Sequence, residues 1–112
     1  MTCEEAHALI LGFPGVTEGT AWNHPAYRVA GKFLTRLREE DDSLVLLGIG
    51  FDEREMLMEA DPTVFHLTDH YRNHPCVLAR IGPLDAAALK AMIERRWRAQ
   101  APKAMVKAYD AG

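Results

Sequence analysis

The tripeptide Asn-His-Pro occurs twice in this sequence, at positions 23–25 and 73–75, and each copy precedes a run of strand-forming residues. Aromatic rings and an arginine accompany both copies, and together with the imidazole they could bind an anionic or polar ligand. A simpler interpretation is a strand entrance, in which Asn bonds to nearby backbone and Pro holds the preceding His extended. The ligand interpretation requires the fold to bring the two histidines together. Its candidate surface comprises Trp22, His24, Tyr27, Tyr71 and His74, beside Arg28 and Arg72.

Three histidines near the second copy, His66, His70 and His74, are spaced by four residues. On a helix this spacing would form a row suited to a metal ion. The surrounding residues favour other structures, because Val64-Phe65 suits a strand and Pro75 would end a helix. We therefore expect no metal site.

Catalytic signatures are sparse. Asp69 beside His70 could act as a general base only if a nucleophile lay nearby, and Cys76 has no recognisable setting for that role. Gly48-Ile49-Gly50 matches neither the dinucleotide fingerprint nor the P-loop, and the sequence has neither HExxH nor paired CxxC. We expect a protein without enzymatic activity or a cofactor.

Basic residues around Gly31 form a second candidate surface. As a projecting hairpin, they could contact phosphates, but positive charge on an exposed strand edge also protects against aggregation. Two C-terminal lysines, four residues apart, could extend this surface or could simply cover the solvated side of a helix. The candidate nucleic-acid contacts are Arg28, Lys32, Arg36, Arg72, Lys103 and Lys107.

Composition limits these possibilities. The net charge of -3 argues against a protein that coats nucleic acid indiscriminately. Residues 1–69 carry 5 Lys/Arg and 13 Asp/Glu, whereas residues 70–112 carry 8 and 3, so one face could still attract an anion. Cys3 and Cys76 are expected to be free thiols. The sequence starts without a signal-peptide pattern and has no membrane-length apolar run, so we expect a cytoplasmic protein without a membrane partner.

The N-terminal half predicts one helix and an antiparallel meander. Thr2 and Glu5 form a capping box for the helix, and four extended runs follow at 19–22, 26–30, 32–38 and 44–49. A three-residue loop from Ala30 to Lys32 would place Phe33 on the same face as Tyr27, with the arginines on the opposite face. A two-residue loop would mix apolar and basic side chains on each face.

The C-terminal half predicts helices around two further strands. Asp52 and Glu55 cap a short helix that places Met56, Leu57 and Ala60 inward, and strands follow at 64–67 and 76–81. Asp85 starts a long helix with an apolar stripe, and Pro102 starts a closing turn or helix. The fold class is α+β: one two-layer domain, 1–112, with a mainly antiparallel sheet of about five to six strands and helices packed on one side. The stripe consists of Leu89, Met92, Ile93 and Trp97.

Three segments carry a resemblance to a known family. Residues 22–33, 70–78 and 97–103, with Phe13-Pro14-Gly15-Val16 and Ala60-Asp61-Pro62, are similar to the MmcQ/YjbR family of small bacterial proteins. The resemblance implies a secretion-chaperone-like α+β domain and DNA binding through two hairpin projections, a double wing. We therefore expect a non-catalytic binding protein with weak, salt-sensitive DNA binding. The alternative is an adaptor that binds a protein or a small anionic ligand on its histidine and aromatic surface.

Overall fold

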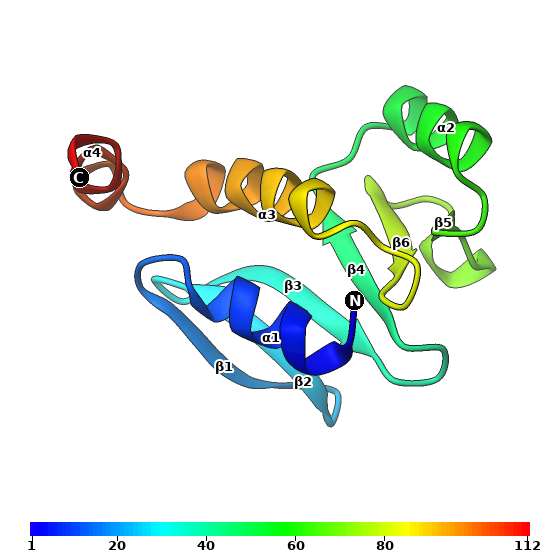
Figure 1. Ribbon diagram of the computed structural model, residues 1–112, viewed down its shortest axis with the longest axis horizontal. Helices are drawn as coiled ribbons and strands as arrows, with labels where there is room; N and C mark the ends of the chain where they lie inside the picture. The colour runs from blue at the N-terminus through cyan, green and yellow to red at the C-terminus, as the bar shows by residue number, and fades with distance from the viewer.

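A six-stranded antiparallel sheet forms the centre of the computed structural model, which describes residues 1–112 (Figure 1). The strand order β1-β2-β3-β4-β6-β5 confirms the predicted α+β class. The strands are β1 (Val16–Ala21), β2 (His24–Val29), β3 (Lys32–Arg38), β4 (Ser43–Leu47), β5 (Phe65–His66) and β6 (Cys76–Arg80). The helices are α1 (Cys3–Leu11), α2 (Phe51–Ala60), the 3-10 helix η1 (Asp69–Tyr71), α3 (Ala86–Gln100) and α4 (Lys103–Ala111).

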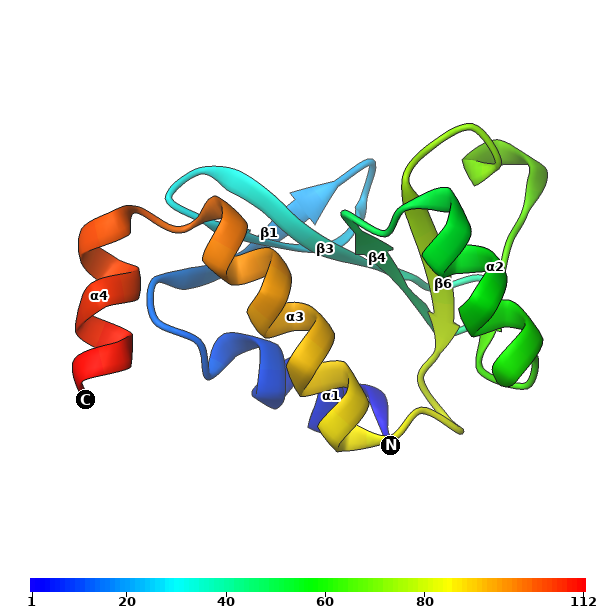
Figure 2. The same ribbon diagram turned by 90° about the horizontal axis from the view of Figure 1, so that it is seen from above.

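Helices α1 and α3 cover one face of the sheet, and the main core lies between them and the strands (Figure 2). The capping box of Thr2 with Glu5 forms as predicted, and Asp85 caps α3 by accepting a hydrogen bond from the Ala88 amide. Most of the predicted α3 stripe is buried, with Trp97 fully enclosed and its Nε1 donating to the Pro14 carbonyl at 2.9 Å. None of the helices combines the length and apolar composition that crossing a membrane requires.

Helix α2 corrects the sequence prediction at its capping residue and at its buried face. Gly50 is the N-cap, Met56 is 62% exposed and Ala60 is exposed, whereas Arg54 is only 5% exposed. Leu57 is partly buried as expected. The inward side of the helix is set by the partners of Arg54, which are backbone carbonyls in the segment between β5 and β6.

Two turns of the same kind join the first three strands. Trp22 and Asn23 have φ of 51° and 66°, and Ala30 and Gly31 have φ of 51° and 77°, which is the two-residue type I′ geometry of β-hairpins. The predicted strand at 19–22 therefore ends one residue early, at Ala21.

The second hairpin has a two-residue loop, so the prediction of a three-residue loop is wrong. Val29 pairs with Lys32, and a register shift between Tyr27 and Arg28 inserts one extra residue into β3. Tyr27 pairs with Thr35 on the core side, whereas Arg28 pairs with Phe33. Phe33 therefore lies on the face away from the core, because the two-residue turn pairs it with Arg28, and the bulge that follows returns Thr35 to the core side.

Candidate ligand-binding cleft

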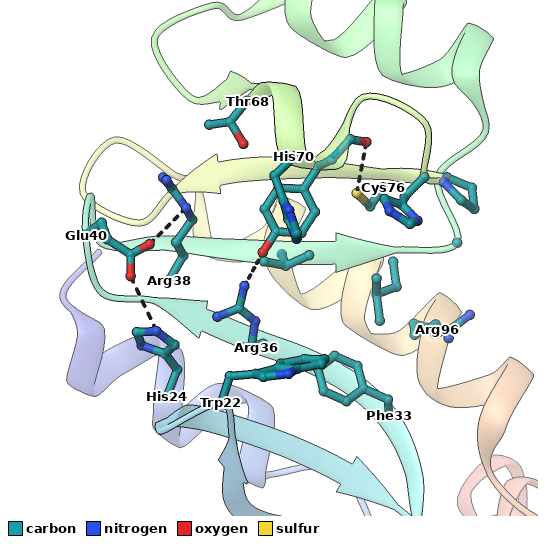
Figure 3. A pocket seen from close by; sticks show the side chains of 16 residues that line it. Trp22, His24, Phe33, Arg36, Arg38, Glu40, Thr68, His70, Cys76 and Arg96 are labelled. Atoms are coloured by element: carbon teal, nitrogen blue, oxygen red, sulfur yellow. Dashed lines mark hydrogen bonds and ion pairs between the residues drawn. The ribbon is translucent and has the colours of Figure 1, made fainter.

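An open cleft of about 780 Å³ lies on the face of the sheet opposite α1 and α3 (Figure 3). Its floor includes Val45, Leu47 and Cys76 from the adjacent strands β4 and β6. Tyr71 and Leu47 pack against a small apolar cluster on this face, formed by Val45, Cys76 and Leu78. The cleft therefore has an apolar base, and polar side chains surround it.

The first wall of the cleft comes from the two hairpins. Trp22 is 81% exposed, and its ring lies 5.8 Å from the Arg36 guanidinium. Phe33 lies behind Trp22, and the Phe33 ring lies 5.6 Å from the Arg28 guanidinium. A left-handed backbone costs a non-glycine residue about 1–2 kcal/mol, and a bulky residue there is uncommon. Trp22 thus combines a strained backbone with an exposed indole, and both are typical of residues retained for binding.

The second wall comes from η1 and the second Asn-His-Pro copy. The ring of His70 lies edge-on to Tyr71 at 4.7 Å between centroids, and 6.4 Å from the ring of His74. The Tyr71 hydroxyl accepts a hydrogen bond from Arg36, which joins this wall to β3. Figure 3 shows Trp22 and Phe33 facing His70 across the cleft, with Arg36 between them.

Arg54 holds the second wall in place from α2. Its Nη1 donates to the His74 carbonyl and its Nη2 to the Arg72 carbonyl, both at 2.9 Å, and the Cys76 carbonyl lies 3.3 Å from Nη1. The guanidinium also lies 4.7 Å from the Phe51 ring. A rigid fork of donors can satisfy several carbonyls at once, so one buried side chain fixes the path of the whole loop.

Charges at one end of the cleft compensate each other. Glu40 contacts Arg38 at 3.0 Å and His24 at 3.4 Å, and Glu39 contacts the other ring nitrogen of His24 at 3.1 Å. Asp41 forms a further ion pair with Arg38 at 2.7 Å. The acidic 39–42 segment forms the β3–β4 turn, and it neutralises Arg38 beside it.

Arg36 and Arg96 have no such compensation. The arginines in ion pairs are Arg38, Arg72, Arg95 and Arg98. The polar neighbours of the two unpaired arginines are neutral: the Tyr71 hydroxyl for Arg36, and for Arg96 the Gln100 amide with its oxygen turned toward the guanidinium. Arg96 reaches the cleft from α3 past the end of β4.

Gly48 makes room for Arg96 at the end of β4. Its φ is +73°, and an added Cβ would lie 3.4 Å from Nη1 of Arg96. Glycine at this position therefore permits both the left-handed backbone and the close passage of the guanidinium.

Four of the five predicted ligand residues line the cleft: Trp22, His24, Tyr71 and His74. The first copy runs into β2, which begins at His24, and the second directly precedes β6, so the two interpretations of the tripeptide are compatible. The prediction that Tyr27 belongs to the ligand surface is wrong, because Tyr27 is buried in the core and its hydroxyl forms a hydrogen bond with His7 Nδ1 at 2.8 Å. Burial raises the pKa of Tyr27 to about 12, with Glu18 adding to the shift.

The predicted nucleic-acid contacts are divided among several places. Arg36 lines the cleft, whereas Arg28 lies against Phe33 and Lys32 is exposed beside the β2–β3 turn. Arg72 is exposed and pairs with Asp69 at 2.5 Å. Lys103 and Lys107 are exposed on α4, and none of these residues apart from Arg36 lines the cleft.

The three evenly spaced histidines do not form one row. His66 lies on β5 and contacts Ser43 Oγ at 2.9 Å and Asp41 at 3.4 Å, whereas His70 and His74 lie in the second wall. No group of three or more histidine, cysteine or acidic side chains has an arrangement that could hold a metal ion. Burial raises the pKa of the Cys76 thiol, which therefore contributes to the cleft as a neutral side chain at pH 7.

Sequence reasoning missed several cleft residues, including Phe33, Arg38, Glu40, His70 and Arg96, and the supporting Arg54. A two-residue Ala30-Gly31 turn would have indicated that Phe33 changes face. The spacing of Arg54 with Leu57 and Met58, three and four residues apart, was the signal that an arginine shares the inward side of α2. Arg96 had no local signal, because it reaches the cleft from a helix on the other layer.

The fold and the cleft together define a small α+β protein with a candidate binding site on the open face of an antiparallel sheet. The YjbR family model matches residues 11–99, so the chain belongs to the YjbR family, as the resemblance predicted. Two similar proteins are "Uncharacterized protein Rv2570" of Mycobacterium tuberculosis (strain ATCC 25618 / H37Rv) and "Uncharacterized protein Mb2600" of Mycobacterium bovis (strain ATCC BAA-935 / AF2122/97). Each is 29% identical over 92 residues, which cover 80% of this chain and 71% of the relative. No solved structure matches the chain.

Proposed function

We propose that this protein binds a small anionic ligand with an aromatic ring in the cleft between the two Asn-His-Pro copies. One observation carries the proposal: the cleft has the opposite charge to the molecule. Of the three arginines in its lining, Arg38 is compensated by Glu40 and Asp41, which leaves the two positive charges of Arg36 and Arg96, whereas the whole chain carries -3. A positive cleft in an acidic protein concentrates anions at that place.

The aromatic part of the proposal rests on the two walls. Trp22 and Phe33 offer ring faces on one side, and His70 and Tyr71 offer rings on the other. A volume of about 780 Å³ falls within the range of roughly 300–1,000 Å³ typical of small-molecule sites. A flat ring would cover the exposed Trp22 indole, and an anionic group would pair with Arg36 or Arg96.

DNA binding through the hairpins is the competing proposal, and it depends on different residues. It requires Lys32, Lys103 and Lys107 to contact phosphates together with Arg28 and Arg36. The two proposals share only Arg36 as a cleft residue. Substitutions outside the cleft therefore separate them.

The test uses three aromatic probes that differ chiefly in charge: benzoate, benzyl alcohol and benzylammonium. The readout is the ¹⁵N NMR spectrum, in which the chain supplies two indole signals, one from exposed Trp22 and one from buried Trp97. We expect benzoate to move the Trp22 indole and the amides of both walls more than the other probes do. The Trp97 indole, enclosed and bonded to Pro14, is the internal control.

Two sets of variants locate the binding site. Arg36→Gln with Arg96→Gln should weaken benzoate binding, whereas Lys32→Gln, Lys103→Gln and Lys107→Gln together should leave it unchanged. The cleft proposal is overturned if benzoate moves the wall amides no more than benzyl alcohol does. Titration with duplex DNA at low salt runs in parallel, and binding that only the triple lysine variant abolishes would favour the hairpin proposal.

A further inference from the structure

The two ends of the cleft differ in the groups that they offer a ligand. One end presents the Arg96 guanidinium without a carboxylate, and the other presents Glu40 between Arg38 and His24 (Figure 3). Arg36, which also has no carboxylate partner, lies between these ends beside Trp22. Aromatic side chains face each other between these ends. We propose that the ligand is a nucleotide, with its base between the aromatic walls and its phosphate at Arg36 and Arg96; this inference rests on the ligand-binding function proposed above.

The base site is the space next to Trp22. Stacking on an aromatic face suits every nucleobase, because each presents a flat π surface. Trp22 is held at the cleft by a two-residue turn, and its ring already lies near the Arg36 guanidinium. The arginine therefore lies at the junction between the base site and the phosphate site, within reach of both parts of one ligand.

The proposed phosphate site is formed by Arg36 and Arg96, the two arginines of the cleft lining that form no ion pair. A guanidinium has five N–H donors, and Arg36 uses one of its nitrogens on the Tyr71 hydroxyl, which leaves further donors for an anion. Arg96 is partly buried beside Gly48, and burial lowers its pKa, although a guanidinium stays charged in proteins. A partly desolvated arginine without a carboxylate partner suits a phosphate, which accepts paired hydrogen bonds from its fork.

The opposite end suits the polar edge of a base. Glu40 uses one oxygen for Arg38 and the other for His24, and a carboxylate has about four lone-pair positions, so acceptor capacity is left for an amino group. Carboxylates accept from exocyclic amino groups of bases. The polarity of the cleft therefore favours a base with an amino group, such as adenine, over one without.

The experiment titrates the full chain with AMP, adenosine and inorganic phosphate, and follows Trp22 by indole NMR shift and by fluorescence quenching. We expect AMP to bind at least about tenfold more tightly than adenosine or phosphate alone, because it engages the stacking and charge sites together. Added salt should weaken AMP binding and leave adenosine binding nearly unchanged.

Matched variants assign each part of the ligand to its site. Arg96→Gln should weaken AMP binding about tenfold and change adenosine binding less than about twofold, whereas Arg36→Gln, which also removes a group beside the base site, should weaken AMP binding more than adenosine binding. Trp22→Asn should weaken both ligands. Arg95→Gln is the control, because Arg95 is the helical neighbour of Arg96, pairs with Glu53 at 3.0 Å and does not line the cleft.

The outcomes distinguish this inference from the function on which it rests. If benzoate perturbs the walls but AMP does not, the nucleotide assignment fails and the anionic aromatic site stands. If neither probe perturbs the walls, both fail. A short single-stranded oligo(dA) is the last arm: binding that depends on Trp22, Arg36 and Arg96 supports recognition of a nucleotide within a strand, whereas binding that needs only Lys32, Lys103 and Lys107 overturns the inference.

Discussion

At the first Asn-His-Pro copy, adjacent residues of the chain form the turn. At the second copy, a side chain from another element fixes the path of the loop. Trp22 and Asn23 form a two-residue hairpin turn directly before His24. The loop that contains His74 is fixed by Arg54, about 20 residues earlier on α2. The same tripeptide thus introduces a strand in both places through different physical causes.

The electrostatic surroundings of the two copies differ as well. His24 contacts Glu39 and Glu40 in the acidic turn, whereas no carboxylate forms an ion pair with His74. His74 instead shares the cleft with Arg36, which also lacks an acidic partner. This difference gives the cleft one compensated end and one positive end, and the sequence repeat alone does not indicate it.

The largest expected effect comes from removing the side chain that holds the second copy in place, Arg54 of α2. Arg54→Met leaves the carbonyls of Arg72 and His74 without their donor, so we expect a loss of roughly 3 kcal/mol in the free energy of unfolding. Urea unfolding measures the loss, and hydrogen exchange of amides 70–76 should accelerate more than exchange in β2.

Arg54→Lys is the matched control for that substitution. It keeps the charge but loses the planar fork, so it should recover part of the stability and only part of the loop protection. Uniform acceleration of exchange across the whole sheet in Arg54→Met would contradict a local role for Arg54 in the second copy.

A smaller effect of opposite sign is expected at the first copy. Trp22→Asn places a residue that tolerates positive φ in the type I′ turn, which relieves about 1 kcal/mol of backbone strain. It also removes the cation–π contact with Arg36, which contributes a similar or smaller free energy. Thermal unfolding should therefore show an unchanged or higher midpoint, although ligand binding is lost. Such a result would indicate that Trp22 is kept for binding at the expense of stability.

The second hairpin supplies the control for this strain. Ala30 has the same φ of 51° but does not line the cleft, so Ala30→Asn should stabilise the protein by about 1 kcal/mol and leave benzoate and AMP binding unchanged. A clear drop in stability for Trp22→Asn, with a gain for Ala30→Asn, would mean that Trp22 has a structural packing role.

The smallest expected effect is the pH dependence of stability that arises from His66, which contacts Asp41 in the acidic turn beside the first copy. Burial lowers the pKa of His66, with Arg80 and Arg38 adding to the shift and Asp41 opposing it. An unfolded histidine takes up a proton near pH 6.5, whereas folded His66 stays neutral to lower pH. The unfolded chain therefore binds more protons in this window, so stability falls as pH drops below about 6.5.

His66→Gln removes this titration while keeping a side chain that can bond to Ser43. The free energy of unfolding, measured by urea at pH 7 and pH 5.5, should differ less between the two pH values in the variant than in the parent chain. An equal or larger difference in the variant would assign the acid sensitivity to other groups.

Local patterns accounted for much of the fold. Short-range spacing accounts for the capped starts of α1 and α3, the buried stripe that includes Leu89, and the strand at each copy of the tripeptide. Two predictions failed for different reasons. Met56 is exposed because long-range hydrogen bonds hold Arg54 in the inward position, and Phe33 faces away from the core because the hairpin turn has two residues.

The element types, the α+β class and the family can be inferred from the sequence, because helix caps, alternation and turn residues act over a few positions. Five of the residues that line the cleft were also among the predicted site residues, with Arg36 as the fifth. Which charges remain without a partner depends on the tertiary structure. The acidic turn neutralises Arg38 and contacts His24, while Arg96 reaches the opposite end of the cleft from α3. Pairing of distant side chains depends on the order of strands in the sheet, and no spacing along the chain encodes it.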